Sequence, residues 1–321
     1  MAEQPTLLLS HLSFSSAALL ESEVALRKIR RTRWKLNKFS LIPAFIALIG
    51  VVILLYPMAA SWVSQVNQSA LVHDYSRALD NAQPSKDQQI QLAHKYNEAL
   101  RSGAIIESGA NKAVGTGSNA GADSTASLKY EDMLHTPQSA VMARVKIDSI
   151  GVDLPIYHGT SDETLRVGVG HLKGTSLPVG GIGTRAVLTA HRGLAEATLF
   201  TNLDKVKKND EIVIEVFGEV LDYRVVDIQI IDPDATQNIK ADPNRDLISL
   251  ITCTPLGINT QRILVTAERV TPTPPAVIED QGKKPDIPGF PWWIVYLSVA
   301  LSIITWYVWT SGTRQISIKP D

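Results

Sequence analysis

The chain has 321 residues, with 31 lysines and arginines against 32 aspartates and glutamates, and its formal net charge is −1. This balance lacks the basic field of nucleic-acid-binding proteins, so no nucleic acid is expected as a partner. The sequence contains one cysteine, which excludes an intramolecular disulfide.

The first long apolar run covers residues 39–58, contains no charged side chain and follows a basic cluster. About 20 apolar residues in a helix cross a hydrocarbon core of roughly 30 Å. We therefore predict a transmembrane helix over 39–58 and a cytoplasmic segment over 1–38, helical in residues 1–26. A cleaved signal peptide is the alternative, although the run is longer than a usual signal core.

A second apolar run covers residues 291–309, with tryptophans and tyrosines crowded at its ends and basic residues after it. Aromatic belts of this kind are typical of membrane interfaces. The sequence predicts a second transmembrane helix here and a cytoplasmic tail over 310–321. The protein is then expected in the cell membrane as a two-pass protein with both termini cytoplasmic and the domain between the two helices extracellular.

Residues 59–139 are predicted to form an extracellular helical segment followed by a flexible, lid-like region. A four-residue apolar spacing predicts helix over Val63–Leu100, broken at Pro84. Residues 102–127 are rich in glycine, alanine and serine, which is typical of a mobile loop.

Residues 140–270 show short β-branched runs separated by turn signals, which favours a mostly β fold with a closed or nearly closed antiparallel barrel. Residues 271–290 are proline-rich and are predicted to form a stiff tether. The predicted strands are 141–147, 152–157, 185–190, 211–217, 221–231, 247–253 and 263–270.

Three side chains that carry chemistry lie at predicted strand ends: Cys253, His191 and Arg262. If 247–253 and 263–270 pair as a hairpin, Cys253 and Arg262 come close together. A thiolate can attack a carbonyl, a histidine can carry the proton, and an arginine can stabilise the oxyanion. Spacing alone leaves the alternative open that the cysteine is an inert core residue and the histidine structural.

Five motifs stand in order along the chain: Leu154–Thr160 (LPIYHGT), Gly168–Gly181 (GVGHLKGTSLPVGG), Leu188–Gly193 (LTAHRG), Ala197–Phe200 (ATLF) and Leu250–Gly257 (LITCTPLG). They resemble the motifs of the sortases, and most closely those of class C, the pilin-polymerising group of Gram-positive bacteria. Two positions depart from the family pattern: Leu250 stands where threonine is usual, and Gln261 where this class often has histidine.

The resemblance implies an eight-stranded barrel with Cys253 as nucleophile, His191 as acid/base and Arg262 as oxyanion partner. It implies cleavage of a Leu-Pro-x-Thr-Gly-like sorting signal after threonine, a thioacyl-enzyme, and transfer to an amine. A pilin lysine is the acceptor in class C. The alternatives are a housekeeping sortase that attaches surface proteins to a cell-wall precursor amine, and a non-catalytic membrane-displayed scaffold.

The remaining polar residues are assigned other roles. The resemblance gives His158 and His171 structural or loop roles, and the sequence predicts no metal site or cofactor. The acidic residues Asp204, Asp210, Glu211 and Glu215 are interpreted as solvated. Many class C sortases carry an Asp-Pro-aromatic triplet in a lid; residues 102–139 lack it, and Tyr130 and Met133 are the nearest bulky candidates. We hypothesise a lid that is held differently or closes weakly.

Overall fold

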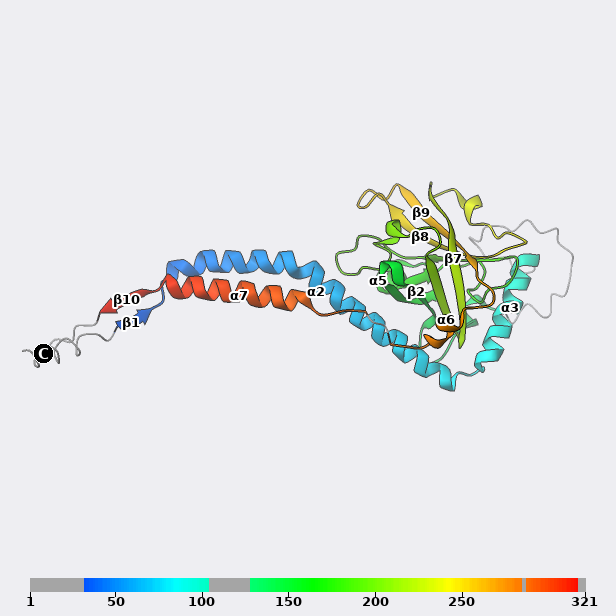
Figure 1. Ribbon diagram of the computed structural model, residues 1–321, viewed down its shortest axis with the longest axis horizontal. Helices are drawn as coiled ribbons and strands as arrows, with labels where there is room; N and C mark the ends of the chain where they lie inside the picture. Colours follow the sequence, from blue (N-terminus) through cyan, green and yellow to red (C-terminus); the bar gives the residue numbers. More distant parts are fainter. Residues whose placement is uncertain (1–31, 104–127, 285–286, 317–321) are drawn as a thin grey trace, which may run out of the picture. The chain divides into compact units, whose positions relative to one another are not determined.

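A computed structural model describes residues 32–103, 128–284 and 287–316 (Figure 1). It divides into two compact units. One joins the described residues up to Tyr56 with those from Trp292 onward, and the other runs from Pro57 to Pro291. The helix predicted over residues 1–26, and the part of the predicted loop and lid over 104–127, lie outside the described residues.

The first unit contains the apolar runs and a small sheet that was not predicted. Helices spanning Lys38–Ala78 and Trp292–Thr310 are long and apolar enough to cross a membrane. Strand β1 (Thr32–Lys35) pairs antiparallel with β10 (Thr313–Ile316), so the segments that precede and follow the two helices meet. The Trp34 ring stacks on Trp309 with centroids 5.6 Å apart, and its Nε1 donates to the Trp309 carbonyl at 3.1 Å.

Helix α2 (Leu41–Ala78) joins two segments that the sequence led us to separate. It begins after a 3-10 turn at Lys38–Ser40 and continues past residue 58, where the predicted transmembrane helix ends, and through Val63, where a second helix was predicted to begin. The prediction of two helices across this stretch was therefore wrong.

The break at Pro84 is confirmed. A 3-10 turn at Leu79–Asn81 follows α2, and α3 covers Lys86–Ser102. Ser85 caps α3 in a capping box: its hydroxyl accepts from the Gln88 amide, while the Gln88 side chain accepts from the Ser85 amide. Gly103, in a left-handed conformation, ends the helix.

The second unit is built on a closed eight-stranded barrel with strand order β2-β3-β4-β5-β8-β9-β7-β6, which confirms the mostly β fold class. Helix α5 (Asp162–Val167) precedes β4, and all seven predicted strands are present with bounds shifted by no more than two residues. The strands are β2 (Val141–Ile147), β3 (Val152–His158), β4 (Val169–His171), β5 (Thr184–Thr189), β6 (Glu211–Val216), β7 (Glu219–Ile231), β8 (Asp246–Thr254) and β9 (Gln261–Arg269).

The strand missing from the sequence prediction is β4. It has only three residues, pairs parallel with β3 and lies in a glycine-rich stretch with no apolar alternation. A Cβ on Gly170 would stand 2.4 Å from the Gly159 carbonyl oxygen, so this strand needs glycine for the backbones to approach.

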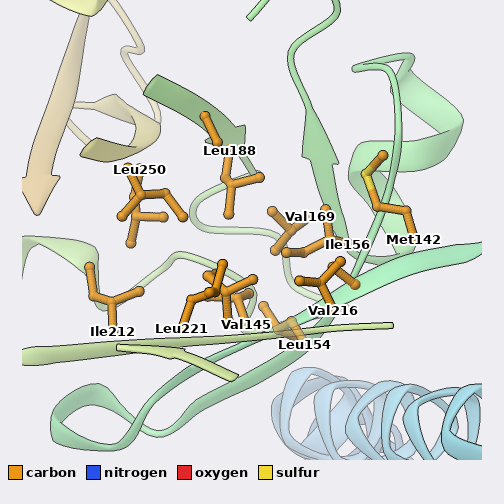
Figure 2. Close-up of a cluster of buried hydrophobic side chains, with 14 of the residues drawn as sticks. Met142, Val145, Leu154, Ile156, Val169, Leu188, Ile212, Val216, Leu221 and Leu250 are labelled. Carbon is orange, nitrogen blue, oxygen red and sulfur yellow. The ribbon is translucent and has the colours of Figure 1, made fainter. Parts of the chain in front are cut away.

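Buried hydrophobic side chains from different strands cluster together, as Figure 2 shows. Each of the labelled side chains is buried, and they come from β2, β3, β4, β5, β6, β7 and β8. This close packing gives the strand ends a rigid base. The labelled residues are Met142, Val145, Leu154, Ile156, Val169, Leu188, Ile212, Val216, Leu221 and Leu250.

The proline-rich segment after β9 is hydrogen-bonded to the barrel at two of its residues. It contains a short helix, α6 (Pro275–Glu279). The Thr273 hydroxyl donates to the Val220 carbonyl at 3.1 Å, and Gln281 Nε2 donates to the Gly218 carbonyl at 2.7 Å. Side-chain bonds to β7 and the turn before it thus attach Thr273 and Gln281 to the barrel, and the stiff tether over 271–290 stays a prediction.

A buried arginine stabilises the same wall of the barrel. Arg144 Nε and Nη2 donate to the Asp153 carboxylate at 2.7 and 2.6 Å, and Nη1 donates to Glu215 at 3.2 Å and to the Lys283 carbonyl at 3.0 Å. Burial works to lower the pKa of Arg144, but the hydrogen bonds and charge of Asp153, then Glu215, raise it overall. The interpretation of Glu215 as solvated was wrong, because its side chain is only 8% exposed.

The segment before β2 is attached to the barrel by Tyr130 and Met133, both buried. His171 Nε2 donates to the Ser176 carbonyl at 2.8 Å, and its Nδ1 lies 2.8 Å from the Tyr130 hydroxyl. Burial lowers the pKa of His171 to about 4, so its imidazole is neutral. His158 donates to the Met133 carbonyl at 2.7 Å. Both histidines therefore have hydrogen-bond partners within the fold, and Tyr130 and Met133 are buried in the core; the lid stays a prediction.

Candidate active site

Cys253 and Arg262 lie opposite each other on neighbouring strands. Strands β8 and β9 form the predicted antiparallel hairpin, and its register pairs Cys253 with Arg262 and Thr252 with Ile263. Directly opposite residues have their side chains on the same face of the sheet, about 5 Å apart at Cβ. Both side chains are half-buried, and Cys253 is a free thiol. The structure thus brings together two of the three predicted site residues.

The Arg262 guanidinium is only partly engaged. Its Nη1 donates to the Asn259 and Gln261 carbonyls, both at 2.9 Å. Among the described residues no carboxylate forms an ion pair with Arg262, and no acceptor is bonded to its Nε or Nη2. These N–H groups are therefore free to donate to a substrate oxygen.

His191 lies level with Cys253 on the other side of β8. The parallel register of β5 and β8 ends with Thr189 opposite Ile251, and the Ala190 amide donates to the Ile251 carbonyl at 3.3 Å. Two residues beyond this pair lie His191 and Cys253. Because neighbouring strands are about 4.8 Å apart, this register places the third predicted residue beside the cysteine.

Two hydrogen bonds cross between the segments that carry His191 and Cys253. The Thr252 hydroxyl donates to the Ala190 carbonyl at 2.8 Å, and these two residues directly precede Cys253 and His191. Between the residues that directly follow His191 and Cys253, Arg192 Nη1 donates to the Thr254 hydroxyl at 3.1 Å. The residues before and after the cysteine are therefore bonded to the residues before and after the histidine.

Arg192 has two further partners in the loop that follows β5. Its Nε donates to the Thr201 carbonyl at 3.1 Å, and its Nη2 forms an ion pair with Asp204 at 2.7 Å. Sequence reasoning did not single out this residue and interpreted Asp204 as merely solvated. Its position directly after the histidine was a signal, but its partners are up to 62 residues away in the chain.

The same loop also contacts helix α2. The Ser61 hydroxyl lies 2.8 Å from the Thr198 hydroxyl, and Gln65 Nε2 donates to that hydroxyl at 3.1 Å. The Phe200 amide donates to the His191 carbonyl at 3.1 Å. The loop bearing the histidine is thus held between α2 and β8.

The arrangement suits acyl transfer by a thiol. It offers a nucleophile and a cation with free donors on one face of the β8–β9 hairpin, and a histidine level with them that can carry the proton. Within the described ranges, no three histidine, cysteine or acidic side chains gather closely enough to hold a metal ion.

Comparisons of the sequence and of the structure with known proteins both find sortases. Residues 145–270 match the family model described as the Sortase domain. Sortase D of Bacillus subtilis (strain 168) is 30% identical over 131 residues, which cover 40% of this chain and 63% of that protein. The chain thus matches less than two thirds of this curated relative.

Solved structures match over more of their length. Sortase C1 of GBS Pilus Island 1 is 37% identical with a TM-score of 0.54, and the match covers 64% of this chain and 92% of that one. Sortase A from Corynebacterium diphtheriae is 38% identical with a TM-score of 0.51, covering 66% of this chain and 95% of that one.

Proposed function

Since the chain belongs to the sortase family, we propose that it is a membrane-anchored cysteine transpeptidase acting on a Leu-Pro-x-Thr-Gly-like sorting signal. The observation that carries the proposal is the register that pairs Cys253 with Arg262, with His191 level with them across β8. One nucleophile, one proton carrier and one oxyanion donor are what thiol acyl transfer requires.

Each residue has one role in the proposed reaction. The Cys253 thiolate attacks the carbonyl carbon of the signal threonine, and the Arg262 N–H groups that lack an acceptor stabilise the oxyanion. As the carbon–nitrogen bond breaks, the protonated His191 imidazole gives its proton to the departing glycine amine, leaving a thioester on Cys253. An incoming amine then attacks the thioester, gives a proton to His191 and returns the free thiolate.

The proposed acceptor is a lysine of a pilin subunit, which makes the protein a class C, pilus-assembling enzyme. Support comes from the sequence motifs and from the likeness to the sortase C1 of GBS Pilus Island 1. The two apolar helices support a two-pass anchor with both termini in the cytoplasm and the barrel outside.

A second candidate is attachment of surface proteins to a cell-wall precursor amine. It is favoured by the likeness to sortase A from Corynebacterium diphtheriae, which matches with nearly the same identity and TM-score as the sortase C1. The fold is therefore shared by both candidates, and the acceptor distinguishes them.

A competition experiment tests the proposal. The full chain in detergent is incubated with a labelled Leu-Pro-x-Thr-Gly peptide and equal amounts of a lysine-containing pilin peptide and a wall-precursor peptide amine. We expect mainly the lysine-linked product by mass spectrometry, and none with Cys253→Ala. A wall-amine product would favour the second candidate, and hydrolysis alone would point to a thiol hydrolase.

The same variant addresses the non-catalytic scaffold. If Cys253→Ala left fibre assembly intact in cells, the protein would act as a scaffold and the transpeptidase proposal would fail.

A further inference from the structure

The regular strand β5 ends two residues before His191. The last ladder pair joins Thr189 to Ile251, and one further backbone bond holds Ala190. The histidine itself therefore lies at the start of a loop, where backbone positions are less constrained than in a sheet. A proton carrier that shifts by about 1 Å loses much of its effect, so something must hold this segment in place.

The Arg192 side chain makes one bond with each nitrogen of its guanidinium group. Nη1 donates to the Thr254 hydroxyl, Nε to the Thr201 carbonyl, and Nη2 pairs with Asp204. Its side chain is only 10% exposed. Because the guanidinium is planar and its N–H directions are fixed, three bonds to three separate positions define both its place and its orientation.

These contacts lie away from the face that carries the reactive thiol. Thr252 and Thr254 flank Cys253 within β8, so their side chains point to the opposite face of the strand. Arg192 reaches one of these threonines, and the Ala190 carbonyl accepts from the other. These two hydrogen bonds can fix the spacing between the His191 segment and β8 without contacting the substrate.

We propose that Arg192 is a positioning residue, which holds the His191 segment against the end of β8 and so keeps the histidine beside Cys253. This rests on the proposed roles of Cys253 and His191. Thr254, Thr201 and Asp204 are its partners, and the Thr252–Ala190 bond is the second attachment. Arg192 does not itself touch the reacting atoms.

The first test is kinetic and uses the full chain in detergent with a Leu-Pro-x-Thr-Gly peptide. Arg192→Ala lowers kcat by roughly 100-fold while KM changes less than about two-fold, because the geometry of the chemical step is lost and not substrate binding. Arg192→Lys recovers only part of the loss, since an ammonium cannot make the three directed bonds. Arg245→Ala, which removes an arginine from the opposite end of β8, is the matched control.

A second test needs no peptide turnover and so separates this inference from the proposed function. The alkylation rate of Cys253 by iodoacetamide is measured in a double-mutant cycle of His191→Ala and Arg192→Ala. If Arg192 positions the histidine, His191→Ala slows alkylation about ten-fold or more in the wild-type background and less than about two-fold in Arg192→Ala. Thr254→Val, a milder change at the same contact, gives an intermediate coupling.

The outcomes are distinct. An equal effect of His191→Ala in both backgrounds overturns the positioning role, whatever the peptide assay shows. A clear coupling in the alkylation cycle, with no turnover of the peptide by the wild type, supports the positioning role and contradicts the proposed sorting signal. A kcat for Arg192→Ala within about two-fold of wild type, in a chain that turns over the peptide, also overturns it.

Discussion

Two arginines on different strands of one barrel, Arg144 on β2 and Arg262 on β9, show how differently the same side chain can be used. Arg144 is 2% exposed and donates to two carboxylates and one main-chain carbonyl. Arg262 is half-buried, and only Nη1 has acceptors among the described residues, both of them main-chain carbonyls. One arginine is fully satisfied within the fold, and the other keeps donors free beside a thiol.

The difference predicts which property each residue controls. A buried charge with complete partners is costly to disturb but has no donors left for a ligand. An incompletely paired arginine contributes little to folding and can stabilise developing negative charge. Substitution at Arg144 should therefore lower stability, and substitution at Arg262 should lower the rate.

The largest effect is expected at Arg144. Arg144→Met leaves Asp153 and Glu215 buried without their cation, which should lower the free energy of unfolding by about 3–5 kcal/mol. Denaturant unfolding of the full chain in detergent measures this change. The triple variant with Asp153→Asn and Glu215→Gln removes the orphaned charges and should recover part of the loss. An Arg144→Met chain as stable as wild type would contradict the structural role.

The second effect is kinetic. Arg262→Ala should reduce kcat by about 100- to 1000-fold, the usual loss for one oxyanion donor, while the melting temperature stays within a few degrees. Arg262→Lys keeps the charge and should restore only part of the rate, since it lacks the fork of donors. A large loss of stability with an unchanged rate per folded molecule would reverse the comparison with Arg144.

The hairpin that brings Cys253 and Arg262 together could be predicted from the sequence, because β-branched runs on both sides of a short loop define a register. The buried partners of Arg144 could not, since Asp153, Glu215 and Lys283 are far apart in the chain and look like ordinary surface residues. Charged residues are mostly exposed, so the sequence favours solvation for each of them.

Contacts between residues that are distant in the chain, or too few residues to form a pattern, also explain the other features that the sequence did not predict. Strand β4 was not predicted because three residues are too few to show a periodicity. Its Gly170 is needed for the close approach of the Gly159 backbone, which is visible only in the fold. The contacts of Arg192 were not predicted because its partners lie on β8 and in a later part of the loop. The unbroken α2 was missed because the transmembrane prediction ended with the apolar run at residue 58, whereas the helix itself continues into the more polar residues that follow.

A third prediction concerns acid and the buried histidine. The neutral form of His171 is favoured in the folded state, where burial lowers its pKa to about 4, whereas the unfolded chain takes up the proton near pH 6.5. Stability is therefore fully present above pH 6.5 and falls as the pH drops from 6.5 towards 4, by about 3 kcal/mol in total.

Unfolding free energies measured between pH 7.5 and 4.5 check this sign. His171→Gln should flatten the pH dependence in that window relative to wild type. If that variant does not fold, a histidine NMR titration of the wild type serves instead. A His171 resonance that titrates near pH 6.5 in the folded protein would rule out the buried neutral state.

The smallest effect is expected at an exposed ion pair. Arg245 and Glu268 form a 2.7 Å pair at the far end of β8, with side chains 37% and 39% exposed. Arg245→Ala should lower stability by less than about 1 kcal/mol and leave kcat unchanged, because solvent screens the pair. A loss of stability as large as that expected for Arg144→Met would show that burial does not explain the difference between Arg144 and Arg245.

The most direct test of the central claim is the intact mass of the full chain after brief incubation with a Leu-Pro-x-Thr-Gly peptide. We expect a mass increase equal to the peptide portion ending at threonine, located on Cys253, removed by hydroxylamine and absent in Cys253→Ala. No adduct on wild type, with every sorting-signal variant of the peptide tried, or an adduct that persists in Cys253→Ala, would contradict the account of a thioacyl-enzyme at the end of β8.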